Sequence, residues 1–143
     1  MPKIIVLYIL KQVTKTIFFT FLILFGILFL NESIQFLEKA SRGELYPSLL
    51  LLVLIYSLPT ILEVSIPISV FLGVLISIYN LNKSNEISFI YQLGMSQKDL
   101  TLVSLIPAFL CSIFIFFNFF YFVPQSSEKL SFLSEAQSFS DKF

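Results

Sequence analysis

Few residues in this chain have the types and spacing that catalysis or metal binding needs. The 143 residues include no histidine, which is the commonest general base and the commonest metal ligand in proteins. The single cysteine, Cys111, cannot form an internal disulfide or a multi-thiolate zinc site, and we interpret it as a small packing residue. The sequence has no phosphate-binding glycine-rich loop, no Gly-x-Ser-x-Gly motif and no paired-aspartate arrangement. We therefore expect no enzyme activity, no metal site and no cofactor.

The strongest candidate for chemistry is Glu63, a carboxylate inside a long apolar run, four residues before Pro67. An ionisable residue within a membrane segment is a functional candidate by default, because a charge is costly there. The alternative, which we favour, is that Glu63 lies near the outer interface or bonds a backbone group beside a proline. No second acid shares its segment to form a proton relay. Glu63, Pro59 and Pro67 are thus the candidate functional positions inside the membrane.

The composition excludes most soluble functions. Hydrophobic residues make up 57% of the chain and charged residues only 13%, whereas about a quarter of an ordinary soluble domain is charged. A small body has much surface for its volume, so this chain could not hide so many apolar side chains from water. Nine basic residues balance nine acidic ones, which leaves no excess to bind a phosphate backbone. We conclude that this is an integral membrane protein and neither a soluble enzyme nor a nucleic-acid binder.

Charged residues mark the ends of the membrane segments, because a charge at the centre of a bilayer is expensive. The charge-free stretches are 16–31, 45–62, 64–82 and 100–127. A helix needs about 20 apolar residues to cross the hydrocarbon core. The predicted fold class is an all-α integral membrane domain over residues 1–123, with three transmembrane helices at about 16–35, 58–81 and 100–122.

The middle stretch is the hardest to divide. A continuous helix from Pro47 to Leu81 would be about 50 Å long, too long for one straight span. The stretch is also short for two spans with a polar turn, although four spans in total are the alternative. We expect one span, kinked at Pro59 and Pro67 because interior prolines remove backbone hydrogen bonds. An apolar lead-in helix over 47–57 would precede it at the outer surface.

The last predicted span has signals at both ends. Ser96, followed three residues later by Asp99, has the spacing of a capping box, which satisfies free N–H groups at a helix start. Pro107 is a candidate kink, and Pro124 is expected to end the helix. Residues 124–143 would then form a polar periplasmic tail.

The first fifteen residues contain three lysines, Lys3, Lys11 and Lys15, and no acid. At helical spacing the lysines gather on one side, opposite Ile9 and Val13, which favours a short interfacial helix ahead of the first span. Positive charge before the first span favours a cytoplasmic amino terminus. The connection between spans two and three is then cytoplasmic. A cleaved signal peptide is the weaker alternative, because no small-x-small cleavage pattern follows the first span.

A short amphipathic helix is predicted in that connection, over about 85–93. Ile87, Ile90 and Tyr91 are spaced so that they share one helix face. Gly94 follows, as expected just past a helix end. Polar residues are few, so we expect one face to touch protein. A helix resting on the lipid interface and a tight helical hairpin are equally supported alternatives.

Several motifs, taken in order, resemble one family. They are the run Val64 to Leu75 (VSIPISVFLGVL), Asn85-Glu86-Ile87-Ser88, Leu93-Gly94-Met95-Ser96, Gly43-Glu44 followed by Pro47, Pro59, and Pro124-Gln125-Ser126-Ser127. No single motif is specific. The ordered set, together with the basic amino terminus, covers essentially the whole chain and resembles the lipopolysaccharide-export permeases of the LptF/LptG family, leaning to the LptF side.

The resemblance implies the permease half of an ABC-type transporter in the inner membrane of Gram-negative bacteria. In such an exporter two related permeases pair, and a cytoplasmic ATPase dimer drives them. They extract lipopolysaccharide from the outer leaflet and pass it to a periplasmic bridge. The resemblance also makes the helix between spans two and three a cytoplasmic coupling helix that docks in the ATPase. Its ATPase-coupling residues would be Glu86, Ile87, Ile90, Tyr91 and Gly94.

Two features depart from the family pattern. Family members are longer, with a periplasmic β-jelly-roll domain and three further spans, so we expect this chain to correspond to the amino-terminal half, with its tail leading into the periplasmic domain. The stretch Asn31-Glu32-Ser33 stands where the family tends to be basic, and a carboxylate there would repel the phosphates of lipid A. The alternative function is a small membrane scaffold or assembly protein that transports nothing, or an inactive permease fragment.

Overall fold

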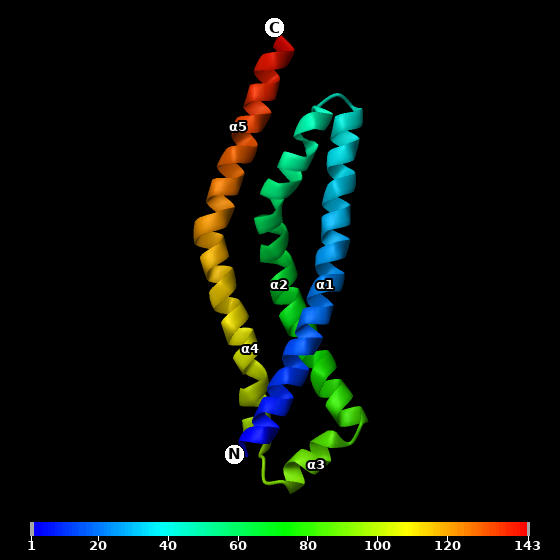
Figure 1. Cartoon of the computed structure of the whole chain (residues 1–143), viewed down its shortest axis with the longest axis vertical. Coiled ribbons are helices and arrows are strands. Elements are labelled where there is room, and N and C mark those ends of the chain that lie inside the picture. The colour runs from blue at the N-terminus through cyan, green and yellow to red at the C-terminus, as the bar shows by residue number, and fades with distance from the viewer. Residues whose placement is uncertain (1, 143) are drawn as a thin grey trace. The chain divides into compact units, whose positions relative to one another are not determined.

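The computed structural model describes the backbone of residues 2–142 and the side chains of residues 2–136. This described part is helical and contains no strand (Figure 1). Its elements are α1 (Lys3–Ser41), the 3-10 helix η1 (Pro47–Leu49), α2 (Leu50–Lys83), α3 (Glu86–Gln92), α4 (Gln97–Phe117), the π-helical turn η2 (Asn118–Phe122) and α5 (Val123–Lys142).

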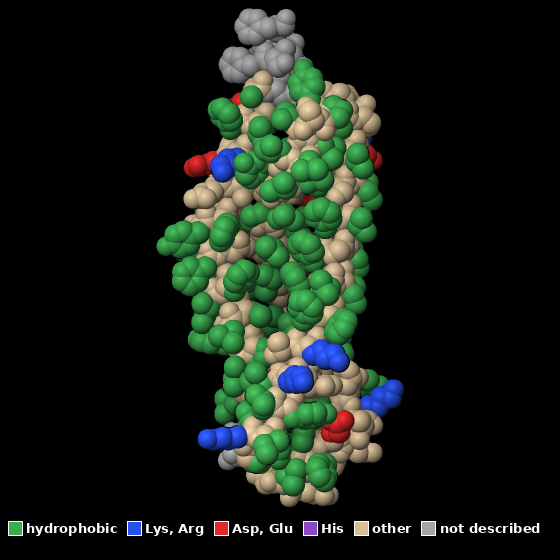
Figure 2. Space-filling view, viewed as in Figure 1, with side chains coloured by type: hydrophobic (Ala, Val, Ile, Leu, Met, Phe, Trp, Pro, Cys, Tyr) green, Lys and Arg blue, Asp and Glu red, His purple; other side chains and the backbone are tan. Residues whose placement is uncertain are grey.

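Three helical stretches in the described chain are long and apolar enough to cross a membrane: Lys3–Ser41, Pro47–Lys83 and Gln97–Ala136. Figure 2 shows apolar side chains over much of the visible surface. Phe18, Phe71 and Phe109 are among the large side chains that are exposed. Exposing such an apolar surface to water would be unfavourable, whereas contact with lipid avoids this cost. The predicted all-α membrane fold with three spanning helices is confirmed, and a fourth span is not found in the described residues.

The chain forms two compact units, and the first contains α1 as far as Leu24 together with Ile66–Phe114. Its core is a cluster of seven buried side chains from α1, α3, α4 and the α3–α4 connection. They are Ile9, Val13, Ile17, Ile90, Met95, Leu100 and Val103. The members from α1 recur every four residues, so they form one continuous stripe along that helix.

Helices α1 and α2 approach each other closely within this unit at Gly73. A Cβ atom added to Gly73 would lie 2.6 Å from both the Cα and the Cγ1 of Ile17. Side chains of any size are therefore excluded at this position, and glycine lets the two backbones meet. Small residues serve the same purpose at many helix contacts in membranes, where dispersion contacts and not water exclusion drive association.

The second unit contains Phe25–Ser65 and the chain from Ile115 onward. The Nδ2 atom of the buried Asn118 donates a hydrogen bond to the backbone oxygen of Pro59, at 3.0 Å. The Nζ atom of Lys129 lies 5.2 Å from the centre of the Tyr56 ring, close enough for a cation–π contact. Within this unit, these contacts join α2 to the η2–α5 stretch.

The amino-terminal segment differs from the interfacial helix that we predicted. It is helical, but it is continuous with the first span in α1, because no proline interrupts residues 3–41. Ile9 and Val13 are 0% exposed and belong to the protein core. The apolar side of this segment therefore packs on protein, where we had expected lipid headgroups.

The lead-in over 47–57 is also not a separate helix. Only Pro47–Leu49 forms a distinct 3-10 turn, and α2 runs without interruption from Leu50 to Lys83. Pro59 and Pro67 are accommodated inside it, as prolines often are in membrane helices, where neighbouring groups satisfy the freed carbonyls.

The prediction that Pro124 ends the last helix is wrong. The chain passes from α4 through η2 into α5, so the polar residues after Pro124 continue as helix. The N–H of Val123 donates to the oxygen of Asn118, a bond five residues long. This wider π turn stands directly before Pro124, which has no N–H and whose ring would crowd the carbonyl of a regular turn.

Candidate functional site

The candidate site is α3 and the groups that hold it in the first unit. The helix follows Asn85, which adopts a left-handed conformation with φ 58°. It ends at Gln92, and Gly94, with φ 94°, lies just past its C-cap residue Leu93. The N–H of Gly94 donates to the oxygen of Tyr91 at 3.1 Å, and the N–H of Met95 donates to the oxygen of Ile90 at 3.4 Å. This pair of bonds is the Schellman motif, with Ile90 and Met95 making its usual apolar contact in the core. The prediction that Gly94 lies just past the end of the helix is confirmed.

The start of α4 is fixed in the same way. The N–H of Ser96 donates to Oδ2 of Asp99 at 3.2 Å, and the N–H of Asp99 donates to Oγ of Ser96 at 3.3 Å. This reciprocal pair confirms the predicted capping box. Only Leu93 to Ser96 lie between α3 and α4, and most of these residues take part in a cap. The direction of α3 relative to α4 is therefore defined by local hydrogen bonds.

The predicted apolar face of α3 is turned toward its own chain. Ile90 is 4% exposed, and Ile87 and Tyr91 pack half-buried against the core cluster. The three residues do share one face, as their spacing indicated. Because Ile90 is buried, it cannot contact a partner protein directly. Any role in coupling would come from its packing against the core cluster.

A different pair of apolar side chains is open to a partner. Phe89 on α3 is 62% exposed, and Leu93, the C-cap residue that follows the helix, is 48% exposed. They lie four positions apart, so they share the outer side. The polar residues beside them, Ser88 and Gln92, are exposed too. Sequence reasoning missed this face, although the spacing of Phe89 and Leu93 is a signal that it could have used.

Glu86 stands in the first turn of α3, and its carboxylate bonds to α1. The hydroxyl of Tyr8 donates a hydrogen bond to Oε2 of Glu86 at 2.8 Å. Within the described residues Glu86 has no basic side chain in ion-pair range, so its charge is not neutralised by the chain itself. A half-buried carboxylate with one neutral donor is suited to accept a cationic group from elsewhere.

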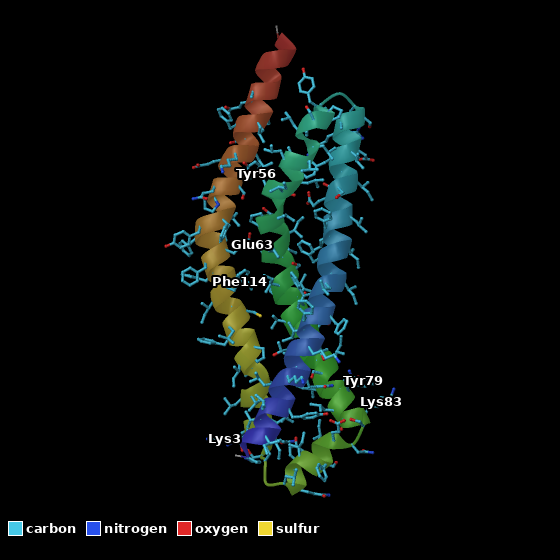
Figure 3. All side chains as sticks on the ribbon, in the orientation of Figure 1. Lys3, Tyr56, Glu63, Tyr79, Lys83 and Phe114 are labelled. Carbon is cyan, nitrogen blue, oxygen red and sulfur yellow. The ribbon has the colours of Figure 1, made fainter. Side chains whose placement is uncertain are left out.

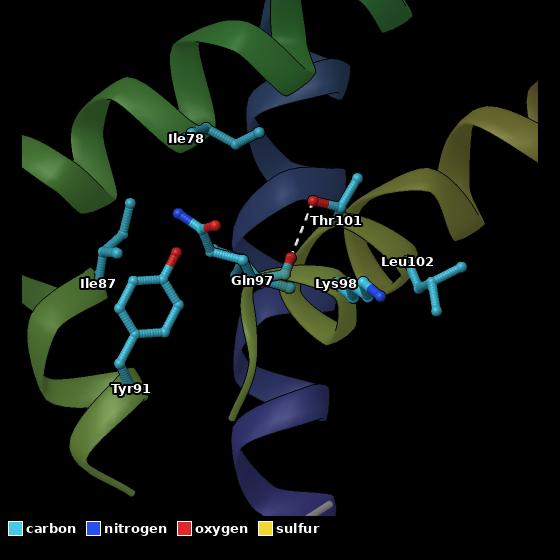
Figure 4. A pocket seen from close by; sticks show the side chains of 8 residues that line it. Ile78, Ile87, Tyr91, Gln97, Lys98, Thr101 and Leu102 are labelled. Carbon is cyan, nitrogen blue, oxygen red and sulfur yellow. Dashed lines mark hydrogen bonds between the residues drawn. The ribbon is translucent and has the colours of Figure 1, made fainter. Parts of the chain in front are cut away.

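A groove of about 640 Å³ opens beside α3 (Figure 4). The side chains of Tyr91 and Gln97 point into it, and the hydroxyl of Thr101 donates to the oxygen of Gln97 at 2.9 Å. Apolar side chains line most of it, among them Ile78 and Ile87. The groove thus separates the end of α2 from the start of α4 on the side where α3 connects them.

The candidate positions inside the membrane make few polar contacts. Figure 3 shows Glu63 part-way along α2, where it is half-buried. Within the described residues its carboxylate has no hydrogen-bond or ion-pair partner, and no group of acids, cysteines or histidines could hold a metal. Pro67 is exposed, whereas the carbonyl of Pro59 accepts the bond from Asn118. A functional role for these three positions stays a prediction.

Asn118 itself was missed by sequence reasoning. It is the single amide in the aromatic run Phe116 to Phe122, and it is buried while the ring residues around it are exposed. A lone polar side chain among aromatics in a predicted span could have suggested an interhelical hydrogen bond.

Comparison with known proteins decides the family. The profile described as "Lipopolysaccharide export system permease LptF/LptG" matches residues 7–138, which includes all of α3. The chain belongs to the LptF/LptG family. It is therefore a multi-pass membrane member of a family of transport permeases.

Individual relatives agree with the family match. The lipopolysaccharide export system permease protein LptF of Escherichia coli K12 is 27% identical over 124 residues, which cover 87% of this chain and 34% of the relative. The LptF proteins of Escherichia coli O157:H7 and Shigella flexneri match with the same identity and coverage. The chain spans about a third of the length of these relatives.

Proposed function

We propose that this chain supplies the amino-terminal spans of a permease subunit in an ABC-type lipopolysaccharide exporter of the bacterial inner membrane. It couples a cytoplasmic ATPase dimer to lipid extraction and acts with a second related permease and a periplasmic bridge. The observation that carries the proposal is α3, a short capped helix between two spans, with one face packed on the core and the other exposed. The identity of the transported lipid is inferred from the family match and from the names of the relatives.

The exposed face of α3 docks in the ATPase. Phe89 and Leu93 provide an apolar contact, and the carboxylate of Glu86 offers a charge for a basic side chain of the ATPase. Ile87, Ile90 and Tyr91 transmit the displacement inward because they pack against the core. Gly94 sets the angle at which α3 leaves the membrane domain, since its φ of 94° is strained for any residue with a side chain.

Docking in a cytoplasmic ATPase requires α3 and the amino terminus to face the cytoplasm. The first unit contains five basic residues and two acidic ones between residues 2–24 and 66–114: Lys3, Lys11, Lys15, Lys83 and Lys98 against Glu86 and Asp99. In Figure 2, several blue side chains lie on the visible face near the end of this unit that carries α3. Excess positive charge next to spans favours the cytoplasmic side.

Binding of the chain in nanodiscs to the cognate ABC-type ATPase tests this proposal. We expect Phe89→Ala to weaken binding roughly tenfold, because truncating an exposed aromatic at the centre of an interface removes a large contact. Phe132→Ala is the matched control, since Phe132 is 70% exposed on α5, in the other unit. It should bind as the unchanged chain does.

Two results would contradict the proposal. One is a well-folded, unchanged chain that does not bind the ATPase at any concentration tested. The other is equal binding by the Phe89→Ala and Phe132→Ala variants. The first result would favour a membrane scaffold that transports nothing, and the second would place the ATPase contact outside α3.

A further inference from the structure

Helix α3 contacts α1, although the two helices are far apart in the sequence. The hydrogen bond from Tyr8 to Oε2 of Glu86 joins residues 78 positions apart, over a distance of 2.8 Å. Because the acceptor is a carboxylate, this bond is stronger than one between two neutral groups. It connects the first turn of α3 to the second turn of α1.

Apolar packing continues the same attachment. Ile9 and Val13 of α1 are 0% exposed and belong to one cluster with Ile90 of α3 and with Met95. One turn farther along α1, the backbone of Ile17 meets α2 at Gly73. The stripe on α1 therefore contacts α3 at one end and α2 at the other.

We infer that residues 3–17 of α1 and helix α3 form one rigid coupling element, in which Tyr8 is the positioning residue that sets the Glu86 carboxylate. A force applied to α3 then moves α1 directly, as well as α2 and α4, to which α3 is joined through the chain. This inference rests on the proposed function for the source of the force. The attachment itself rests on the hydrogen bond and the packed cluster.

Tyr8→Phe isolates the hydrogen bond, because it removes the hydroxyl and keeps the ring. The control is Tyr79→Phe, the same change on a side chain that is 63% exposed and has no hydrogen-bond partner in the described chain. Hydrogen exchange of the α3 amides, measured on the chain in nanodiscs without ATPase, reports how firmly α3 is held. We expect Tyr8→Phe to speed this exchange roughly three- to tenfold, because the lost bond is exposed to solvent, which weakens its charge-assisted part. Tyr79→Phe should leave it unchanged.

Unchanged α3 exchange in Tyr8→Phe would overturn the rigid element. This result is independent of any ATPase, so it can be distinguished from a failure of the proposed function. If the unchanged chain binds no ATPase while Tyr8→Phe still loosens α3, the proposed function fails and the attachment stands.

A double-mutant cycle tests the positioning role of Tyr8. ATPase affinity is compared for the unchanged chain, Tyr8→Phe, Glu86→Ala and the variant with both changes. We expect Tyr8→Phe alone to weaken binding roughly threefold, and to have no further effect once Glu86 is alanine. Additive losses would overturn the positioning role, because they would mean that Tyr8 acts through something other than the carboxylate.

Discussion

Replacing Gly73 with alanine is the most direct test of the packing that brings α1 onto α2. The new Cβ would lie 2.6 Å from backbone and side-chain atoms of Ile17, a distance that real Cβ atoms do not adopt. Since one of those atoms is a backbone Cα, a change of rotamer does not relieve the clash, and the helices must separate. Overpacking of this kind costs about 1–3 kcal/mol. Alanine recovers about 1 kcal/mol through its better helix propensity, so we expect a net loss of up to about 2 kcal/mol in the free energy of unfolding.

The matched control is Gly26→Ala, the same change at a glycine inside α1. Nothing lies within 4 Å of a Cβ added there, so the change should be neutral or stabilising. Both variants can be compared by reversible unfolding in mixed detergent micelles. A Gly73→Ala variant that is as stable as Gly26→Ala would refute the close approach of α1 and α2.

Two further changes test contacts elsewhere in the chain. Ile90→Asp places a charge at a 4% exposed position, so we expect a loss of at least about 3 kcal/mol in the free energy of unfolding. Phe89→Asp, at an exposed position, should keep the fold. Equal stability of the two variants would contradict the inward direction of Ile90. Asn118→Leu removes the bond to the Pro59 carbonyl and should cost about 0.5–1.5 kcal/mol in the same assay. Asn80→Leu, at an exposed position, is its control, and a cost no larger than that of the control would count against the bond.

The features that were best predicted from the sequence are those that a few neighbouring residues determine. Gly94 ends α3 and Ser96 caps α4 through hydrogen bonds that span six residues or fewer. The three spans follow from charge-free apolar runs, which reflect the bilayer and not the packing between helices. Local signals of these kinds need no knowledge of the tertiary structure.

The features that were not predicted from the sequence depend on contacts between residues far apart in the chain. The spacing of α3 indicated an apolar face, but it could not show that Ile90 packs on α1 and leaves Phe89 for a partner. The bond between Tyr8 and Glu86 has no local signature at all. Pro124 was misread because a π turn before it, with Asn118 bonded to a neighbouring helix, lets the backbone continue.

We propose that the exposed side of α3, with Phe89 and Leu93, contacts the cytoplasmic ATPase. A photo-crosslinking amino acid placed at position 89, in cells that express the exporter, tests that contact directly. We predict a crosslink to the ATPase from position 89 and none from position 132, which is equally open but lies on α5. Absence of the ATPase crosslink at position 89, in a chain that is inserted and expressed at the normal level, would contradict the claim.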